Sequence, residues 1–533
     1  MTQSTVTQPT KQGWAVIGVL AAAQFVMVID ATVMNVSISK IVTDLGTTVV
    51  GIQTAITAFT LVMAAFMLTG GKLGNRLGAK RAFGIGLVVY GTGSLLTALS
   101  QNLPQLLLGW SLLEGLGAVL VIPAIAALTS ANYSGKQRAL SFGILGGVAG
   151  AAAAAGPIIG GLVTTYASWR YVFAAETIMC IGILLASRRM ASPERSKHSR
   201  FDALGAVLSI VGLGAFVYGV LQSSQWGWIT PSAAAPVAPL GYSPVIWLVL
   251  VGVVLVALFV RWESHVMRAG GEPLLDLSLL RIPTLRAGLS MLLVQQFVVA
   301  GTFFVLPLYL QTVLGLDAFD TGMKLLPLSA CLLVFALGGS ALTSRFGARA
   351  IARIGIIAIL ASELVLQVSL DPNLRSFTFA LALGLLGSGL GMLASQLGNV
   401  NLSSVPVERG AEVGGLQGTV QNMGASLGTA LVGAMLISTL GTGFVTTVRN
   451  NPTLPPAVLQ AVEKAKSGGV DFASSDVVQK AATDKGLPTA EVNSLVQDYE
   501  TAQIRALKLS VGLLAIFALL GLWFVKNLPG KPE

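Results

Sequence analysis

Two apolar stretches of the chain carry one glycine pattern: GGVAGAAAAAGPIIGG at residues 146–161 and GGLQGTVQNMGASLGT at residues 414–429. Five glycines of the first stretch have partners at the same spacing in the second: Gly146, Gly147, Gly150, Gly156 and Gly160 correspond to Gly414, Gly415, Gly418, Gly424 and Gly428. This repeat indicates a duplicated membrane unit. The copies differ at Pro157, which corresponds to Ala425.

The composition is that of a membrane protein, with 54% hydrophobic residues, 11% charged residues and a mean hydropathy of +0.77. Apolar runs of about 20 residues, enough to cross a bilayer, recur along the chain, and we count about fourteen. They begin near Trp14, Val49, Ala82, Leu103, Ala139, Trp169, Ala203, Val245, Ala287, Gly322, Ile351, Phe377, Gly414 and Leu507. Lipid offers no hydrogen bonds to the backbone, so we predict an all-α polytopic helix bundle. The polar residues 1–12 do not read as a cleaved signal, so the first run is expected to remain.

A second repeat follows the second and tenth runs, as GGKLGNRLGAKR at residues 70–81 and GGSALTSRFGAR at residues 338–349. Four residues match between these loops: Arg76, Gly78, Ala79 and Lys80 correspond to Arg345, Gly347, Ala348 and Arg349. The offset agrees with that of the glycine repeat to within one residue. The two repeats together predict two pseudo-symmetric halves.

The repeats divide the chain into three membrane regions. We expect six-helix bundles at residues 1–190 and 286–533, with two additional helices at residues 201–262 between them. Halves related along the membrane normal are a recurrent transporter plan. The longest loop, residues 443–500, is expected outside the cell as a small helical cap or hairpin, with Thr489 capping a helix that leads into the last span. A gating role and a solvated connector are both open for this loop.

The net charge of +10 reflects membrane topology. Basic residues gather in alternate loops, for example at Lys72, Arg76, Lys80, Arg81, Lys136, Arg138, Arg188, Arg189, Arg195, Arg261, Arg268, Arg345 and Arg349. The opposite loop at residues 222–243 has no charged residue. This asymmetry places both termini in the cytoplasm and argues against a nucleic-acid partner.

Neither cysteine nor histidine suggests catalysis or metal binding. Cys180 and Cys331 lie in apolar runs, and His198 and His265 lie in loops expected in the cytoplasm. We therefore expect no metal, no cofactor and no enzymatic activity.

Four acids inside apolar runs are the candidate functional residues: Asp30, Glu114, Glu176 and Glu363. A carboxylate at the centre of a membrane helix costs about 2.5–3.5 kcal/mol on insertion scales, so such residues usually face a cavity or a partner. Burial favours the protonated form, and the ionised form can bind a lipophilic cation. Competition between proton and cation for one carboxyl is the physical core of antiport. The alternative is a protonated carboxyl that is hydrogen-bonded between helices and has no transport role.

The loop at residues 70–81 has two interpretations. Its glycines Gly71, Gly74 and Gly78 permit a tight reversal, and the basic residues Arg76, Lys80 and Arg81 can meet helix C-termini or carboxylates. Such contacts would latch the two halves in one state, whereas plain positive-inside anchoring is the simpler alternative.

The fifth run carries Gly156 and Gly160 four residues apart, a spacing that lets another helix approach closely. Pro157 removes a backbone hydrogen bond and is expected to bend the helix. Close packing with a bend would seal a leak path and support rocking of the halves. A purely structural packing motif is the alternative.

These segments together resemble the major facilitator superfamily, specifically its 14-helix drug:proton antiporter branch. The resemblance rests on residues 30–36, on the loop from Gly71 to Arg81, on the WRYVF start at residues 169–173 and on the fifth-run motif. That motif comprises Gly147, Gly156, Pro157, Gly160 and Gly161. Through the match at residues 30–36, the resemblance implies a proton-coupling or cation-binding role for Asp30.

The chain departs from the branch pattern at five positions. Asn75 replaces the usual loop acid, Ser111 stands where an arginine is usual, and Glu114 replaces a glutamine. Glu176 and Ile178 replace an asparagine and a proline. The chain has thus lost a membrane arginine and gained two membrane acids, so we hypothesise that Asp30, Glu114 and Glu176 share the coupling role.

The sequence therefore predicts a multi-pass protein of the bacterial plasma membrane, monomeric, that exports hydrophobic, cationic compounds in exchange for protons. The nearest alternative is an exporter of an endogenous metabolite, lipid, siderophore or antibiotic. A distant alternative is an intramembrane enzyme or channel.

Overall fold

The computed structural model describes residues 14–133, 135–188, 190, 202–232, 234–372, 374–405, 410–467 and 472–530. Every regular element in these ranges is a helix, which confirms the predicted all-α class. Twelve helices are long and apolar enough to cross a membrane, and bent α7 (Gly135–Tyr166) is a thirteenth if its two parts form one span. The 20-residue helix α4 (Ala79–Ala98) is not among them, so the predicted count of fourteen is not confirmed.

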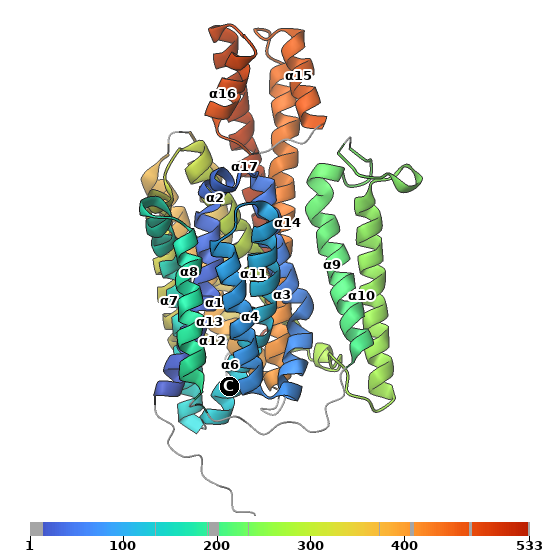
Figure 1. Cartoon of the computed structure of the whole chain (residues 1–533). Helices are drawn as coiled ribbons and strands as arrows, with labels where there is room; N and C mark the ends of the chain where they lie inside the picture. Colours follow the sequence, from blue (N-terminus) through green and yellow to red (C-terminus); the bar gives the residue numbers. More distant parts are fainter. Residues whose placement is uncertain are drawn as a thin grey trace, which may run out of the picture.

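The first half of the chain forms a bundle of long helices with short connections (Figure 1). Besides α4 and α7, its helices are α1 (Ala15–Val36), α2 (Ile38–Leu45), α3 (Val49–Leu77), α5 (Leu103–Leu106), α6 (Gly115–Asn132) and α8 (Arg170–Ser187). A π-helical segment, η1 (Leu107–Glu114), joins α5 to α6.

The second half repeats this arrangement. Its elements are η3 (Leu279–Arg281), α11 (Pro283–Leu308), the π-helical η4 (Tyr309–Val313), α12 (Ala318–Ser369), α13 (Ser376–Ser403), α14 (Gly410–Arg449) and α17 (Thr489–Val525). α12 comprises two helices that meet at Gly347. Across the halves, α7 packs along α12 and α3 packs along α14.

Two further helices stand at the side of the bundle. α9 (Ala203–Trp226) and α10 (Pro244–Arg268) pack mainly on each other, with the short η2 (Pro239–Gly241) in the connection between them. In the described part of the chain, α9 is the helix of this pair that packs along α3 and α14 of the bundle (Figure 1). Apolar side chains of both helices, such as Val211 and Val253, are exposed as expected for a lipid-facing surface.

The loop repeat is also a structural repeat. Gly78 and Gly347 both have positive φ, 90° and 73°, and each reverses the chain between two helices. Lys80 Nζ donates to the carbonyl oxygens of Arg188 and Met190, at 2.8 and 2.6 Å, beyond the end of α8. Its counterpart Arg349 binds the corresponding end of α17, where Nε donates to a carbonyl oxygen at 2.8 Å. Lys80 and Arg349, which are equivalent in the loop repeat, therefore both donate hydrogen bonds to carbonyl oxygens just beyond the end of the last helix of their own half.

The glycine repeat brings matched helices into close contact within each half. Gly156 and Gly160 of α7 lie against α1, where a Cβ on Gly160 would be 3.0 Å from the Cα of Val33. Gly424 and Gly428 of α14 lie against α11 in the same way, facing backbone carbonyl oxygens. The repeat predicted from sequence therefore corresponds to equivalent packing of two helix pairs.

A different pair of repeated glycines faces the opposite half. A Cβ on Gly150 of α7 would be 3.3 Å from a side-chain methyl of α12, and one on Gly418 of α14 would be 3.1 Å from a side chain of α3. By contrast, Gly146 and Gly414 have no atom within 4 Å of such a Cβ. The glycine pattern thus combines contacts within a half, contacts across halves and unconstrained positions.

The far end of α7 contacts the start of α12 through backbone atoms. A Cβ on Gly161 would collide with the carbonyl oxygen of Ala318, and one on Gly322 would collide with that of Pro157. The backbone N–H of Phe319 also donates to Thr165 Oγ1 at 3.0 Å. α7 bends by 42° between Ile144–Ala153 and Ala155–Tyr166, where the ring of Pro157 would crowd the carbonyl four residues earlier.

A helical cap projects from the bundle at the end opposite the C-terminus (Figure 1). The extended ends of α14 and α17 carry α15 (Pro456–Ser467) and α16 (Ser475–Asp484) between them, which confirms the predicted helical character of this segment. Thr489 is the first residue of α17 and makes no capping hydrogen bond, so the predicted capping role of Thr489 is wrong. Pro488 precedes the helix and cannot supply a side-chain acceptor.

Candidate functional site

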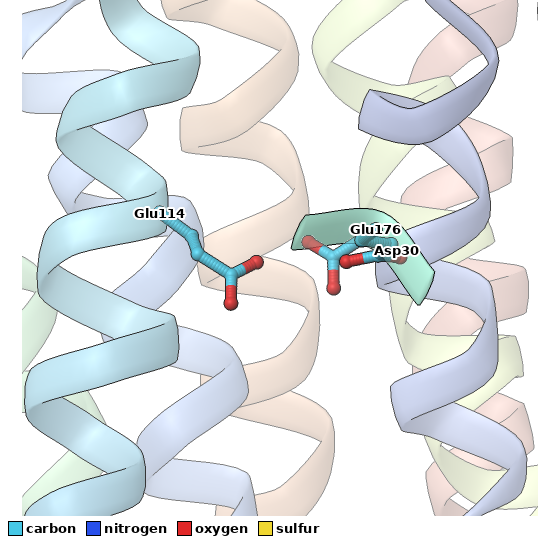
Figure 2. Close-up of side chains that lie close together, drawn as sticks. All are labelled: Asp30, Glu114 and Glu176. Carbon is cyan, nitrogen blue, oxygen red and sulfur yellow. The ribbon is translucent and has the colours of Figure 1, made fainter. Parts of the chain in front are cut away.

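Three of the four predicted membrane acids meet inside the first half. Asp30 comes from α1, Glu114 from the end of η1 and Glu176 from α8. One carboxylate oxygen of each lies within 4.8 Å of the other two, and all three side chains are buried. Figure 2 shows the carboxyl group of Glu114 pointing across to those of Asp30 and Glu176. We call this group the carboxyl cluster.

The fourth acid, Glu363, lies apart from the carboxyl cluster. It belongs to the second helix of α12, is buried, and neither of its carboxylate oxygens has a hydrogen-bond partner. In the register of the loop repeat Glu363 corresponds to Ser94 of α4, so the two halves are not chemically equivalent at this position.

Asp30 is held by a tryptophan. Trp110 Nε1 of η1 donates to Asp30 Oδ1 at 2.8 Å, and the indole ring stacks on Phe59 with centroids 4.8 Å apart and planes 4° apart. Because indole N–H only donates, Oδ1 of Asp30 is an acceptor in this contact. Asp30 Oδ2 has no hydrogen-bond partner.

The two glutamates contact hydroxyl groups on α4. Thr97 Oγ1 lies 3.0 Å from Glu114 Oε1, and Ser94 Oγ lies 3.1 Å from Glu176 Oε2. The second oxygen of each glutamate has no hydrogen-bond partner. Tyr90 lies on the same face, since residues at i, i+4 and i+7 align along a helix. Its side chain is fully buried and lies near all three acids of the carboxyl cluster.

Glycines and a π-helical turn make this packing possible. A Cβ on Gly93 of α4 would be 2.6 Å from the carbonyl oxygen of Gly109 in η1, so only glycine permits this approach. π-helical turns recur at functional sites, and here η1 contributes both Trp110 and Glu114.

The carboxyl cluster has no basic partner within the described part of the chain. The ion pairs found there join Lys40 and Arg170 to Asp44, and Arg449 to Glu463, all outside the cluster. Three acids therefore share one buried space without a fixed positive charge.

Sequence reasoning found the acids but missed their surroundings. The hydroxyl side chains Tyr90, Ser94 and Thr97 follow helical spacing, which was an available signal. Trp110 lies four residues before Glu114, a spacing that places both on one helix face, although nothing in the sequence identifies Asp30 as its partner.

The loop residues lie away from the carboxyl cluster. Lys80 joins α4 to the end of α8 within the first half, so this contact does not latch the two halves together. Lys80 and Arg81 line a cavity of about 590 Å³ at these helix ends, and Arg76 is exposed. The side chain of Asn75 is outside the described residues.

Comparison with known proteins agrees with this architecture. The family model described as Major Facilitator Superfamily matches residues 20–429. The "Tetracenomycin C resistance and export protein" of Streptomyces glaucescens is 28% identical over 463 residues, covering 86% of this chain and 82% of that protein. The "Probable actinorhodin transporter" of Streptomyces coelicolor is 29% identical over 445 residues, covering 81% and 74%.

Two other similar proteins cover a larger share of this chain. The "Multidrug resistance protein Stp" of Mycobacterium tuberculosis is 27% identical over 476 residues, covering 89% of this chain and 82% of that protein. A solved inward-facing, unoccupied structure of a bacterial homolog to the human lysosomal transporter Spinster has a TM-score of 0.60 at 14% identity. It covers 97% of this chain and 98% of that chain. The family match spans most of the chain, and the duplicated helix bundle agrees with it: the protein belongs to the major facilitator superfamily of membrane transporters.

Proposed function

We propose that the protein is a proton-coupled multidrug efflux antiporter that exports hydrophobic, cationic compounds by alternating access. The observation that carries this proposal is the carboxyl cluster, in which Asp30, Glu114 and Glu176 lie within 4.8 Å of one another without a basic partner in the described residues. Like charges at this distance in a buried site cannot all be ionised, so protons or cations must neutralise them.

Antiport follows from this neutralisation. A proton that enters from one side occupies a carboxyl and lowers the affinity of the site for a cation. Release of that proton to the other side restores the negative charge. A transporter that exposes the carboxyl cluster alternately to each side therefore exchanges protons for cationic substrate. The relative named for multidrug resistance supports a broad range of substrates.

The architecture suits such exchange. We assign residues 1–190 and 286–533 to two halves that rock against each other, with residues 201–262 as an additional helix pair. The basic loops, including those of Lys80 and Arg349, favour a cytoplasmic position for both termini in a bacterial plasma membrane. The chain is proposed to act as a monomer.

Transport by purified protein in liposomes tests this function. An imposed pH gradient should drive uptake of a fluorescent lipophilic cation into inside-out oriented vesicles, and collapse of the gradient by a proton ionophore should stop it. Asp30→Asn should lose gradient-driven transport while keeping its elution profile and melting temperature. Flux that is independent of the gradient would contradict antiport and would favour the channel alternative.

A second candidate is the export of one endogenous product. The relatives named for tetracenomycin C and actinorhodin favour it, because each is named for a single antibiotic. A panel of cationic, neutral and anionic compounds in the same liposomes separates the candidates. Strong preference for one neutral or anionic compound would support the second.

A further inference from the structure

We propose that the cavity between α4 and α8 binds the headgroup of one anionic phospholipid. The cavity has a volume of about 590 Å³ and lies at the basic-loop end of the first half, where α4 packs along α8 (Figure 1). Its lining includes the basic residues Lys80, Arg81 and Arg188, together with Gly84 and Leu184. The inference goes beyond the proposed function, since lipid binding can be measured without transport.

The cavity carries a positive charge that is not balanced within the described part of the chain. Its lining holds three cationic side chains and no carboxylate. Arg81 and Arg188 are exposed, and neither belongs to an ion pair between described residues. Lys80 Nζ donates to two backbone carbonyl oxygens, which fix the ammonium beside the end of α8 without neutralising it. The charge of the cavity is therefore complementary to an anion.

The residue types favour a phosphate group. The guanidinium group of arginine presents a planar fork of N–H donors that matches the oxygens of a phosphate. Arg81 stands in the first turn of α4 and Arg188 directly follows α8, so one phosphate in the cavity can contact both helices. Basic pockets between membrane helices at the cytoplasmic side are typical binding sites for anionic lipid headgroups.

The outer faces of both helices indicate that the phosphate belongs to a lipid. Each helix has exposed apolar side chains on the same face as its basic residue, three or four and seven positions further into the membrane. They are Ile85 and Val88 on α4, aligned with Arg81, and Leu185 and Ile181 on α8, aligned with Arg188.

These four apolar side chains form a surface for acyl chains. Each is between 45% and 55% exposed. Seven helical residues span about 10 Å, so the apolar surface begins within two turns of the basic residues. A phospholipid with its headgroup in the cavity has its acyl chains over this surface, whereas a free anion makes no use of it.

The loop repeat shows that Arg81 is not needed for the chain reversal. Arg81 corresponds to Ala350 in the second half, and the same reversal forms there at Gly347. Lys80, by contrast, has a basic counterpart in Arg349, which also binds the end of a helix. The additional charge at Arg81 is thus specific to the half that has the cavity. Plain positive-inside anchoring requires such a charge but requires no cavity.

The site depends on the first half alone. All of its lining residues lie between Leu77 and Arg188, on α3, α4 and α8. A bound headgroup therefore joins the start of α4 to the end of α8 wherever the second half stands. The lipid stabilises the first half and is not a transported compound.

Native mass spectrometry of the purified full-length protein, titrated with dioleoyl phosphatidylglycerol, tests the site. The wild type should bind one such lipid at least about tenfold more tightly than dioleoyl phosphatidylcholine, which has the same acyl chains and no net charge. Arg81→Ala/Arg188→Ala should weaken binding about thirtyfold, since each basic residue near a membrane surface contributes a factor of about five. Arg268→Ala/Arg353→Ala removes the same charge from exposed residues outside the cavity and should bind like the wild type.

A variant that keeps the charge separates a formed site from general attraction to anionic lipid. A Cβ on Gly84 would lie 3.5 Å from a methyl group of Leu184, an ordinary contact, so the longer side chain of Gly84→Leu would extend into the cavity. This variant should weaken binding about tenfold at unchanged net charge. If Gly84→Leu fails to fold, Arg188→Ala alone, which alters one exposed side chain, should still weaken binding about fivefold.

Three results would overturn the proposal. Equal affinity of the wild type for the two lipids would refute recognition of an anionic headgroup. Equal weakening in the cavity variant and in Arg268→Ala/Arg353→Ala, with full binding by Gly84→Leu, would show a general effect of charge. Phosphatidylglycerol should also raise the melting temperature of the wild type, and an equal rise with inorganic phosphate would assign the cavity to a free anion.

Discussion

Replacement of Trp110 by phenylalanine should make the carboxyl group of Asp30 hold a proton more tightly. The substitution removes the N–H group that donates to Asp30 Oδ1 at 2.8 Å. It retains an aromatic ring that can stack on Phe59, as the indole does at a centroid distance of 4.8 Å. The variant therefore tests one hydrogen bond in a side chain that is 1% exposed, with little change in packing.

The magnitude follows from the type of hydrogen bond. A bond to a charged group contributes about 1.5–3 kcal/mol. That bond stabilises the ionised form of Asp30 more than the protonated form, so its loss favours the proton. Since about 1.4 kcal/mol corresponds to one pH unit, the pH of half-maximal proton release should rise by about 1–2 units.

Substrate-induced proton release, followed with a pH indicator in weakly buffered detergent solution, measures this midpoint. Trp169→Phe is the matched control, because Trp169 Nε1 donates to Asp44 Oδ2 at 3.1 Å, outside the carboxyl cluster. The control should keep the wild-type midpoint. A Trp110→Phe midpoint equal to that of the wild type, in protein of unchanged melting temperature, would refute the reasoning.

Three other changes have defined outcomes. Gly160→Ala would place a Cβ 2.9 Å from a methyl group of α1 and should lower the free energy of unfolding by about 1–3 kcal/mol through overpacking. Gly146→Ala is the matched control, because the space around it is open, and this variant should melt at or above the wild-type temperature. Equal losses of stability in both variants would contradict the close packing of Gly160 against α1. Lys80→Met removes two hydrogen bonds at the end of α8 and should lower the melting temperature without changing the pH midpoint of proton release. A shifted midpoint would instead link the loop to coupling. Gln311→Leu removes the hydrogen bond that Gln311 Nε2 of η4 donates to the carbonyl oxygen of Val36 in the other half. Backbone hydrogen exchange in residues 309–313 should rise several-fold as a result. Unchanged exchange would show that this hydrogen bond does not hold η4 against the first half.

Much of the fold follows from sequence because it depends on local properties. Helix formation depends on apolar length, and the equivalence of the halves depends on a glycine spacing that each copy carries within a single helix. The prediction that Gly156 and Gly160 pack closely required only the spacing of small residues. The number of spans could not be predicted as well. The helix α4 combines several glycines with two basic residues at its start, and it is not among the helices that are long and apolar enough to cross a membrane.

The acids of the carboxyl cluster could be predicted from the sequence, but their contacts could not. A single acid in an apolar run stands out, so Asp30, Glu114 and Glu176 were evident from the sequence, but which acids meet depends on how α1, η1 and α8 cross. Glu363 looks equivalent in the sequence and lies elsewhere in the fold. The hydroxyl partners were overlooked because serine and threonine are common in membrane helices and usually bond to their own backbone.

The contacts along α7 set a preferred direction of movement. Near Gly161 its backbone touches that of α12, whereas near Gly150 only the tip of a side chain reaches it. Side-chain tips can slide past one another, but touching backbones must separate as rigid bodies and expose polar groups. Parting the halves at the basic-loop end therefore meets less resistance than parting them at the capped end. In a transporter with this bias, the state open at the basic-loop end is favoured, and opening of the capped end requires the larger input of free energy.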